Sequence, residues 1–231
     1  MSTATPVRRV VTEPLVEGDH LDQPEFHRRY EAMPPGVKAE LIDGVVSMPS
    51  PVSKGHAYSQ YHSTFWLGHY ELKTPGVQGS GELTVILGNR SEPQPDAVLR
   101  IKPECGGQTV VVGHYVHGAP ELVIEISKTT RYIDLGPKLI DYGRAGVSEY
   151  VVRSIDPDAI HWFRQTEGAL ARVAPDPDGL YRSTVFPGLW LDPAALLSGD
   201  LTRLYQVVEL GVATAEHAAF VARLAANRAS G

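Results

Sequence analysis

Two acidic residues stand in runs of sequence whose other members are apolar. Asp96 opens the segment DAVLRI, and Glu125 lies within ELVIEIS. A carboxylate in such a strand is costly to bury unless it is paired, hydrogen-bonded or bound to a metal. Carboxylates from neighbouring strands, with carbonyl groups and water, form the all-oxygen shell that suits Mg²⁺ or Mn²⁺, and such a site favours phosphoryl chemistry. The alternative without a metal is that Glu125 forms an ion pair with Lys138 or Arg131. Asp96 would then be only a turn residue that opens its strand.

Turn and capping signals place the elements that must position these residues. Asp43-Gly44 between two apolar runs predicts a hairpin over 37–49, and Asp22 is a candidate helix cap. Strands are expected at 77–87, 96–101, 108–113 and 121–127, with antiparallel hairpins over 148–186. Helices are expected at 23–33, 53–73, 133–145 and, as one long or broken helix, 200–227. The order predicts an α/β (α+β) fold: a mixed central sheet flanked by helices, with extra antiparallel hairpins and a C-terminal helix.

The composition limits the class of protein. The 231 residues include 21 Lys and Arg against 27 Asp and Glu, and the net charge of −6 argues against a protein that coats nucleic acid. There is no stretch of about 18 apolar residues and no signal-peptide pattern, so we expect a cytoplasmic protein without membrane association. The single cysteine, Cys105, excludes an intrachain disulfide and a Cys-rich zinc fold, and we expect its thiol to be exposed in a glycine-rich turn. His114 and His117 fall in an expected loop without an acidic companion, so we do not expect them to bind metal.

Four segments share a pattern with known nucleases. They are AELIDGVVSMPSP followed by His56, then QPDAVL, then PELVIEIS, and finally Asp134-x-x-x-Lys138-x-x-x-Tyr142-x-x-x-Gly146-Val147-x-Glu149-Tyr150. As a set they resemble the bacterial putative restriction endonuclease family of the PD-(D/E)XK nuclease superfamily. The resemblance spans nearly the whole of the part expected to fold, and it implies a restriction-endonuclease-like sheet.

The superfamily pattern places a lysine two residues after the glutamate, where this chain has Ser127. Lys128 is one residue too far, and it points to the other face if the strand stays regular. Lys138 is better placed, because Asp134, Lys138 and Tyr142 recur every four residues and one helix face can aim the amine at the strand. The resemblance also implies a lysine from this helix. We therefore favour Lys138 over Lys128.

The resemblance implies hydrolysis of a DNA phosphodiester bond by a water bound to Mg²⁺ or Mn²⁺. Asp96 and Glu125 would hold the ion, and Lys138 would orient or deprotonate the water or stabilise charge. Glu40 on the first hairpin resembles an additional acidic position of the family, and it would bind the metal directly or through water.

Three further residues are candidates for substrate binding: His56, Lys128 and Tyr142. His56 would contact phosphate or orient a carboxylate, and a capping or packing role is its alternative. We expect a nuclease-like domain at 21–195, a flexible lead-in at 1–20 and a C-terminal helical extension at 196–231, which packs on the same core or on a second copy.

The sequence thus predicts a metal-dependent endodeoxyribonuclease. We expect a homodimer, because duplex cleavage commonly uses two active sites, and weak, salt-sensitive DNA binding confined to one groove. The alternative is a catalytically inactive nuclease-fold protein that binds nucleic acid or protein, which Ser127 and the acidic charge favour. A third possibility is an enzyme with another phosphoester substrate, since a metal site alone does not name the polymer.

Overall fold

A six-stranded mixed sheet forms the centre of the computed structural model, which describes residues 12–49 and 51–230. In the order of the sheet, its strands are β11 (Ala169–Val173), β10 (Asp158–Thr166), β9 (Glu149–Ile155), β8 (Leu122–Ser127), β5 (Ala97–Ile101) and β3 (Val77–Gly81). In this sheet β8 and β9 are parallel and the other neighbours are antiparallel. The chain crosses between the parallel strands through α3 (Arg131–Asp134) and α4 (Pro137–Ala145), as such a connection requires. The expected mixed sheet with antiparallel hairpins is confirmed.

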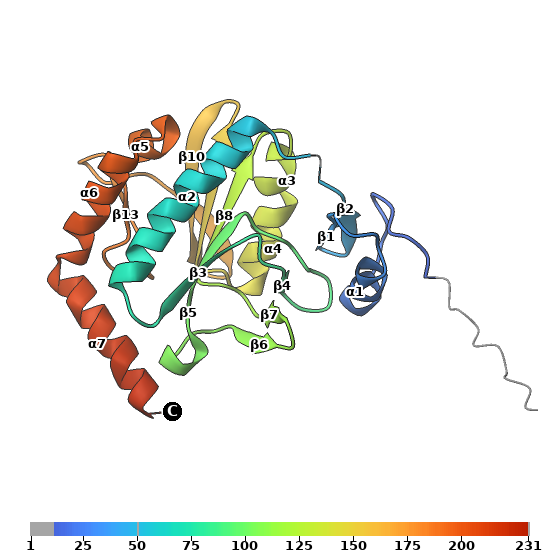
Figure 1. The fold of residues 1–231 in the computed structure, drawn as a ribbon, viewed down its shortest axis with the longest axis horizontal. Helices are drawn as coiled ribbons and strands as arrows, with labels where there is room; N and C mark the ends of the chain where they lie inside the picture. The colour runs from blue at the N-terminus through green and yellow to red at the C-terminus, as the bar shows by residue number, and fades with distance from the viewer. Residues whose placement is uncertain (1–11, 50, 231) are drawn as a thin grey trace, which may run out of the picture.

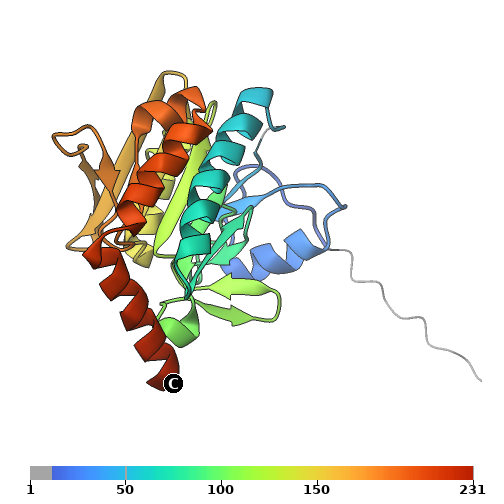
Figure 2. The same cartoon turned by 60° about the vertical axis from the view of Figure 1, so that its left-hand side comes forward.

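Helices cover both faces of the sheet (Figure 1). One face carries α2 (Lys54–Lys73), α5 (Pro193–Ser198), α6 (Leu201–Val212) and α7 (Ala215–Ser230). Figure 2 shows α6 running beside α2, and α7 continuing from the lower end of α6. Trp66 of α2, Trp162 of β10 and Phe220 of α7 share one buried cluster there, so the expected extension at 196–231 packs on the core of its own domain. On the other face α4 packs Tyr142 against Tyr150. No helix in the described ranges is long and apolar enough to cross a membrane.

The hairpin and the first helix follow their local sequence signals. Asp22 Oδ1 accepts a hydrogen bond from Glu25 N at 3.0 Å and caps α1 (Gln23–Glu31). β1 (Glu40–Ile42) pairs with β2 (Val45–Ser47) across the two-residue loop Asp43-Gly44. Both loop residues have positive φ, +47° and +81°, which tight hairpin turns favour. This hairpin brings Glu40 to the edge of the functional site described below.

Several elements differ from the sequence-based expectation. The segment 77–87 is divided, because Glu82 turns the chain with φ of +49°, and β4 (Val85–Ile86) joins β6 (Val110–Val112) and β7 (Tyr115–His117) in a separate sheet. The loop expected at His114 and His117 therefore contains a strand. β12 (Tyr181–Arg182) pairs with β13 (Trp190–Leu191) and does not extend the main sheet. The helix over 133–145 is two helices, because Gly136 adopts φ −126° and ψ −103°, and the helix over 200–227 breaks between α6 and α7.

The expected lead-in at 1–20 and the expected exposure of Cys105 need correction. Residues 1–11 lie outside the described residues, but Leu15 is 4% exposed in a cluster with Val46, and Gly18 N donates to Val46 O at 2.9 Å. Cys105, in the short 3₁₀ helix η1 (Pro103–Cys105), is buried in the main core. The reason is that α7 packs across η1, where Asn227 Nδ2 donates to Cys105 O at 3.0 Å.

Candidate active site

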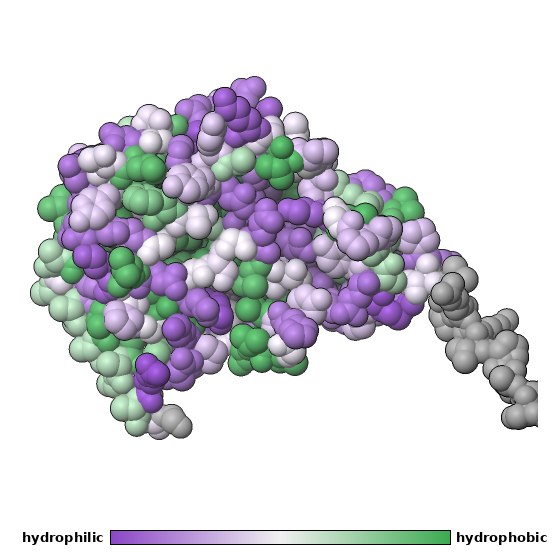
Figure 3. Space-filling model, in the orientation of Figure 1, coloured by the Kyte–Doolittle hydropathy of each residue, from purple (hydrophilic) through white to green (hydrophobic). Residues whose placement is uncertain are grey.

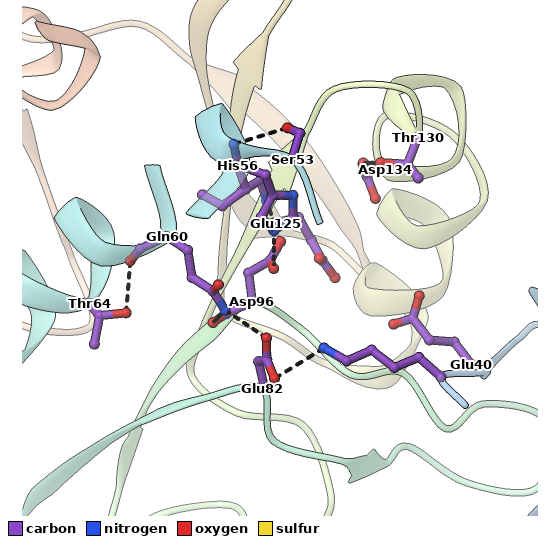
Figure 4. Close-up of polar contacts among 12 residues, drawn as sticks. Glu40, Ser53, His56, Gln60, Thr64, Glu82, Asp96, Glu125, Thr130 and Asp134 are labelled. Atoms are coloured by element: carbon purple, nitrogen blue, oxygen red, sulfur yellow. Dashed lines mark hydrogen bonds and ion pairs between the residues drawn. The ribbon is translucent and has the colours of Figure 1, made fainter. Parts of the chain in front are cut away.

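A cavity of about 210 Å³ opens where the start of α2, the segment from β8 into α3, and the β1-β2 hairpin come together. Carboxylates predominate among its charged lining residues, which are Glu40, Glu82, Asp96, Glu125, Asp134, Lys38, Lys128 and Lys138. Figure 3 shows hydrophilic side chains gathered on this face between α2 and β1. The close-up in Figure 4 shows how acids from several elements surround one space.

Glu125 lies in β8, and Asp96 directly precedes the adjacent antiparallel strand β5. The register of β5 on β8, continued by one residue, sets Asp96 opposite Glu125. Asp96 Oδ2 accepts a hydrogen bond from Ile126 N at 2.7 Å, and Oδ1 lies 2.7 Å from His56 Nε2 (Figure 4). His56 is in the first turn of α2, which begins beside the sheet because Ser53 caps it. The sequence therefore brings a histidine onto one of the two strand carboxylates.

Lys138 lies between Glu40 and Glu125. Its Nζ is 2.9 Å from Glu40 Oε2 and 2.9 Å from Glu125 Oε1, and it is 3.9 Å from Asp134 Oδ1. Tyr142, one helical turn further along α4, donates from its hydroxyl to the same Glu125 Oε1 at 2.8 Å. One face of α4 thus presents a lysine and a tyrosine to the strand carboxylate, as the four-residue spacing predicts.

Burial and charge compete at these groups. Burial raises the pKa of Glu125 well above its usual value, although the positive charge of Lys138 opposes this, and Glu40 adds to it. Burial disfavours the cationic form of Lys138, but attraction to Glu125 and Glu40 outweighs burial and raises the pKa of the lysine. Burial also raises the pKa values of Asp134 and of Tyr142, so the phenol stays a neutral donor. The lysine is therefore cationic. Five acidic side chains and three lysines line the cavity, and a divalent cation placed there would favour the charged forms of the carboxylates whose pKa values burial raises.

The donor atoms suit a hard divalent cation, but they are not arranged as a ready-made metal centre. In the part of the chain that the structure describes, no three His, Cys, Asp or Glu side chains converge as ligands. The ammonium of Lys138 stands between Glu40 and Glu125, and Asp96 faces His56. Glu125 lines the cavity, and within the described residues its Oε2 accepts no hydrogen bond. An all-oxygen donor set with surplus negative charge and one unbonded carboxylate oxygen fits Mg²⁺ or Mn²⁺ chemically.

Lys128 lines the cavity, whereas a regular strand would place it on the opposite face of the sheet. β8 ends at Ser127, so Lys128 belongs to the loop that follows and the alternation of strand faces does not apply to it. Its exposed side chain lines the cavity, on the same side as Glu125 and not on the opposite face as expected. It makes no ion pair within the described residues, whereas Lys138 contacts two carboxylates.

Glu82 is a cavity residue that sequence reasoning missed. Its carboxylate lies 3.1 Å from Lys38 Nζ and 3.5 Å from Gln60 Nε2, and Gln60 also donates to Asp96 O at 3.2 Å (Figure 4). Its positive φ ends β3 and turns the carboxylate toward the cavity. The glycines of VQGSGE, which interrupt an otherwise strand-like run, were the available signal for this turn.

Asp134 and Gln94 complete the surroundings of the lysine. Asp134 is 2% exposed, and its Oδ2 accepts a hydrogen bond from Thr130 Oγ1 at 2.7 Å. Gln94 N donates to Glu40 Oε1 at 2.6 Å and fixes that carboxylate against the lysine. Neither residue stands out in the sequence as a site residue, because Asp134 enters only through the helical spacing and Gln94 acts through its backbone.

Comparisons with known proteins identify a family and a similar fold. The model of the Uma2 family, described as putative restriction endonuclease, matches residues 23–194. A solved structure described as a putative nuclease belonging to DUF820, from Anabaena variabilis ATCC 29413, is similar with a TM-score of 0.54 and 13% identity. The match covers 78% of this chain and 97% of that chain, and at this identity the likeness concerns the fold alone. No curated protein matches the chain.

Proposed function

Because the chain belongs to the Uma2 family of putative restriction endonucleases, we propose that it hydrolyses DNA phosphodiester bonds with the help of Mg²⁺ or Mn²⁺. The observation that carries the proposal is the meeting of Asp96, Glu125 and Lys138 at one cavity, with the lysine amine 2.9 Å from Glu125. Carboxylates of two neighbouring strands and a lysine form the constellation that phosphodiester hydrolysis needs.

Asp96 and Glu125 would hold the metal, and Glu40 would join them directly or through a water molecule. A bound divalent cation supplies an activated water and neutralises charge that develops on the phosphoryl group. The unbonded Oε2 of Glu125 supports this role, since the other oxygen of that carboxylate is already engaged by Lys138 and Tyr142.

The chain's own side chains would hold the carboxylates in position and stabilise negative charge. Lys138, whose pKa the neighbouring carboxylates raise, would orient or deprotonate the water or stabilise negative charge. Tyr142 fixes the orientation of Glu125 through its hydroxyl. His56 fixes Asp96 in the same way or contacts the phosphate, and Lys128 at the rim is available to a phosphate oxygen.

The second candidate is a catalytically inactive protein of the same fold that binds nucleic acid or another protein. Ser127 at the usual lysine position is the observation in its favour. The position of Lys138 favours the nuclease. Its amine, on α4, lies 2.9 Å from Glu125, the carboxylate beside which the superfamily pattern places the lysine at position 127.

The test is the cleavage of plasmid and oligonucleotide DNA in Mg²⁺ or Mn²⁺ by the wild type, Asp96→Ala and Glu125→Ala. We expect the wild type to cut and both variants to lose activity. Equal activity in all three proteins would overturn the proposal. Calorimetric titration with Mn²⁺ separates the two candidates, because an inactive descendant would show no divalent binding that depends on Asp96 and Glu125.

A further inference from the structure

A second, more open groove lies at the end of β5 away from the active site. Arg100 of β5 and Lys102 just after it line this groove, together with Gln78 of the edge strand β3, which pairs with Arg100. At about 3.4 Å per residue, the four residues from Asp96 to Arg100 span about 14 Å. No residue of the described ranges lines both this groove and the cavity at Glu125, so the two are separate places on the molecule.

Arg100 is a buried cation without a carboxylate partner. It is 6% exposed, and within residues 12–49 and 51–230 it makes no ion pair. Its Nη2 donates to Gln78 Oε1 at 2.5 Å, and its Nη1 lies 3.4 Å from Thr109 Oγ1. A guanidinium has five N–H groups, so three have no acceptor in the described structure, and Nε is one of these. Because buried polar groups are normally hydrogen-bonded and buried charges normally paired, Arg100 lacks an anion.

Glu121 is the acidic residue whose charge reaches Arg100, but its carboxylate is engaged elsewhere. It is 4% exposed, its Oε2 accepts from Ile101 N at 2.9 Å, and its Oε1 accepts from Gln108 N at 3.0 Å. Burial raises the pKa of Glu121, and the two backbone hydrogen bonds and the charge of Arg100 oppose this. Glu121 does not line the groove, so the free N–H groups of the arginine remain open to an anion from solution.

The rest of the groove indicates which anion fits. Arg100 and Lys102 against Glu104 leave the lining with one net positive charge. The apolar walls come from three residues, which are Pro103, Val110 and Val111. Both valines belong to β6 and are about half exposed, at 52% and 55%, and Figure 3 shows hydrophobic side chains gathered where Figure 1 places β6. The groove thus combines a site for a single negative charge with apolar surface beside it.

We propose that this groove binds a small carboxylate with an apolar carbon chain. The carboxylate pairs with Arg100 and Lys102, and the chain lies on the walls formed by Pro103 and the two valines of β6. A guanidinium suits this ligand because its planar fork matches the two oxygens of a carboxylate. The single charge of the ligand matches the net charge of the lining. This site is independent of the proposed nuclease activity, since none of its residues lines the cavity at Glu125.

The experiment is a ¹H–¹⁵N NMR titration of the full chain with sodium butyrate, in EDTA and beside sodium chloride at equal ionic strength. The buried Nε–H of Arg100 is a direct probe, and Arg100→Gln identifies its signal by removing it. We expect butyrate to shift this signal in a saturable way and chloride not to do so. Acetate should bind about 3- to 10-fold more weakly than butyrate, because it lacks two methylene groups that the walls would cover.

Lys102→Gln removes one charge from the groove and leaves the buried arginine in place. We expect its affinity for butyrate to fall about 3- to 5-fold, the effect of a partly exposed ion pair. Lys54→Gln is the matched control, because Lys54 is exposed and lines neither the groove nor the cavity, and it should bind butyrate as the wild type does. In Arg100→Gln the saturable shift of the Val111 amide should disappear.

The site would be overturned if chloride reproduced the butyrate shift, or if Lys102→Gln bound butyrate as tightly as Lys54→Gln does. Tighter binding of inorganic phosphate than of butyrate would overturn the choice of a carboxylate, and equal affinities for acetate and butyrate would overturn the role of the apolar walls. The titration contains no metal and no DNA, so its outcome does not depend on whether the protein is a nuclease.

Discussion

Replacing Lys138 with methionine tests the electrostatic basis of the site. Methionine is unbranched and apolar, so Lys138→Met removes the charge while it keeps most of the side chain's packing. Glu40 and Glu125 would then remain buried, at 7% and 4% exposure, without the amine that now lies 2.9 Å from each. The variant therefore measures what the lysine contributes to holding the carboxylates together.

The expected effect is large. Removing one partner of a buried ion pair costs about 3–5 kcal/mol, because it leaves an uncompensated buried charge. In a chain of this length each kcal/mol shifts Tm by about 2–4 °C, so we expect a fall of about 6–20 °C. The cost should be smaller at acidic pH, since Glu125, whose pKa burial already raises, can take up a proton.

Urea unfolding followed by circular dichroism gives the free energy of unfolding of each variant. Lys128→Met is the matched control, because Lys128 lines the same cavity but is exposed and unpaired in the described structure, so its loss should stay within about 0.5 kcal/mol. Adding Glu125→Gln to Lys138→Met should restore part of the stability, since the variant then buries one charge fewer.

A loss of less than about 1 kcal/mol in Lys138→Met, the value of an exposed pair, would refute this reasoning. So would equal losses in the two lysine variants, because the site would then not distinguish the buried amine from the exposed one.

Three further outcomes follow from contacts elsewhere in the fold. A Cβ at Gly211 would lie 2.1 Å from Gly188 O, so Gly211→Ala should lower the free energy of unfolding by at least about 1–3 kcal/mol, and an unchanged Tm would contradict this packing. Burial lowers the pKa of His217 below 6.5, so near this pH the unfolded chain binds a proton that the folded chain does not. The contribution of His217 to the free energy of unfolding should therefore be constant above about pH 6.5 and fall below it. His217→Gln should remove that part of the pH dependence in urea titrations. His56→Ala should lower Mg²⁺-dependent cleavage about 10- to 100-fold with DNA binding retained, because the ring contacts the Asp96 carboxylate; wild-type rates would exclude that role.

The parts of the fold that local chemistry determines were predictable from the sequence. Asp22 and Ser53 cap helices because their side chains accept backbone hydrogen bonds, and Asp43-Gly44 turns a hairpin because both residues tolerate positive φ. The meeting of Lys138 with Glu125 was predictable for a similar reason, since helical spacing and strand alternation restrict which side chains share a face.

The remaining features depend on contacts between distant segments. Cys105 is buried because α7, more than a hundred residues later, packs across it, and no local pattern indicates that. Glu82 enters the cavity through a backbone angle that non-glycine residues seldom adopt. Lys128 reaches the cavity because β8 ends one residue before it, and strand ends are poorly determined by sequence.

The central claim is that the carboxylate of Glu125 takes part in metal-dependent DNA hydrolysis and does more than stabilise the sheet. The most direct measurement is the single-turnover rate of cleavage of a labelled duplex in Mg²⁺ by Glu125→Gln beside Glu121→Gln. The two glutamates lie on or next to the same strand and are equally buried, at 4% exposure, but Glu121 accepts backbone hydrogen bonds outside the cavity. The proposed function predicts that Glu125→Gln loses cleavage while folded Glu121→Gln keeps the wild-type rate; equal rates in both variants would contradict it.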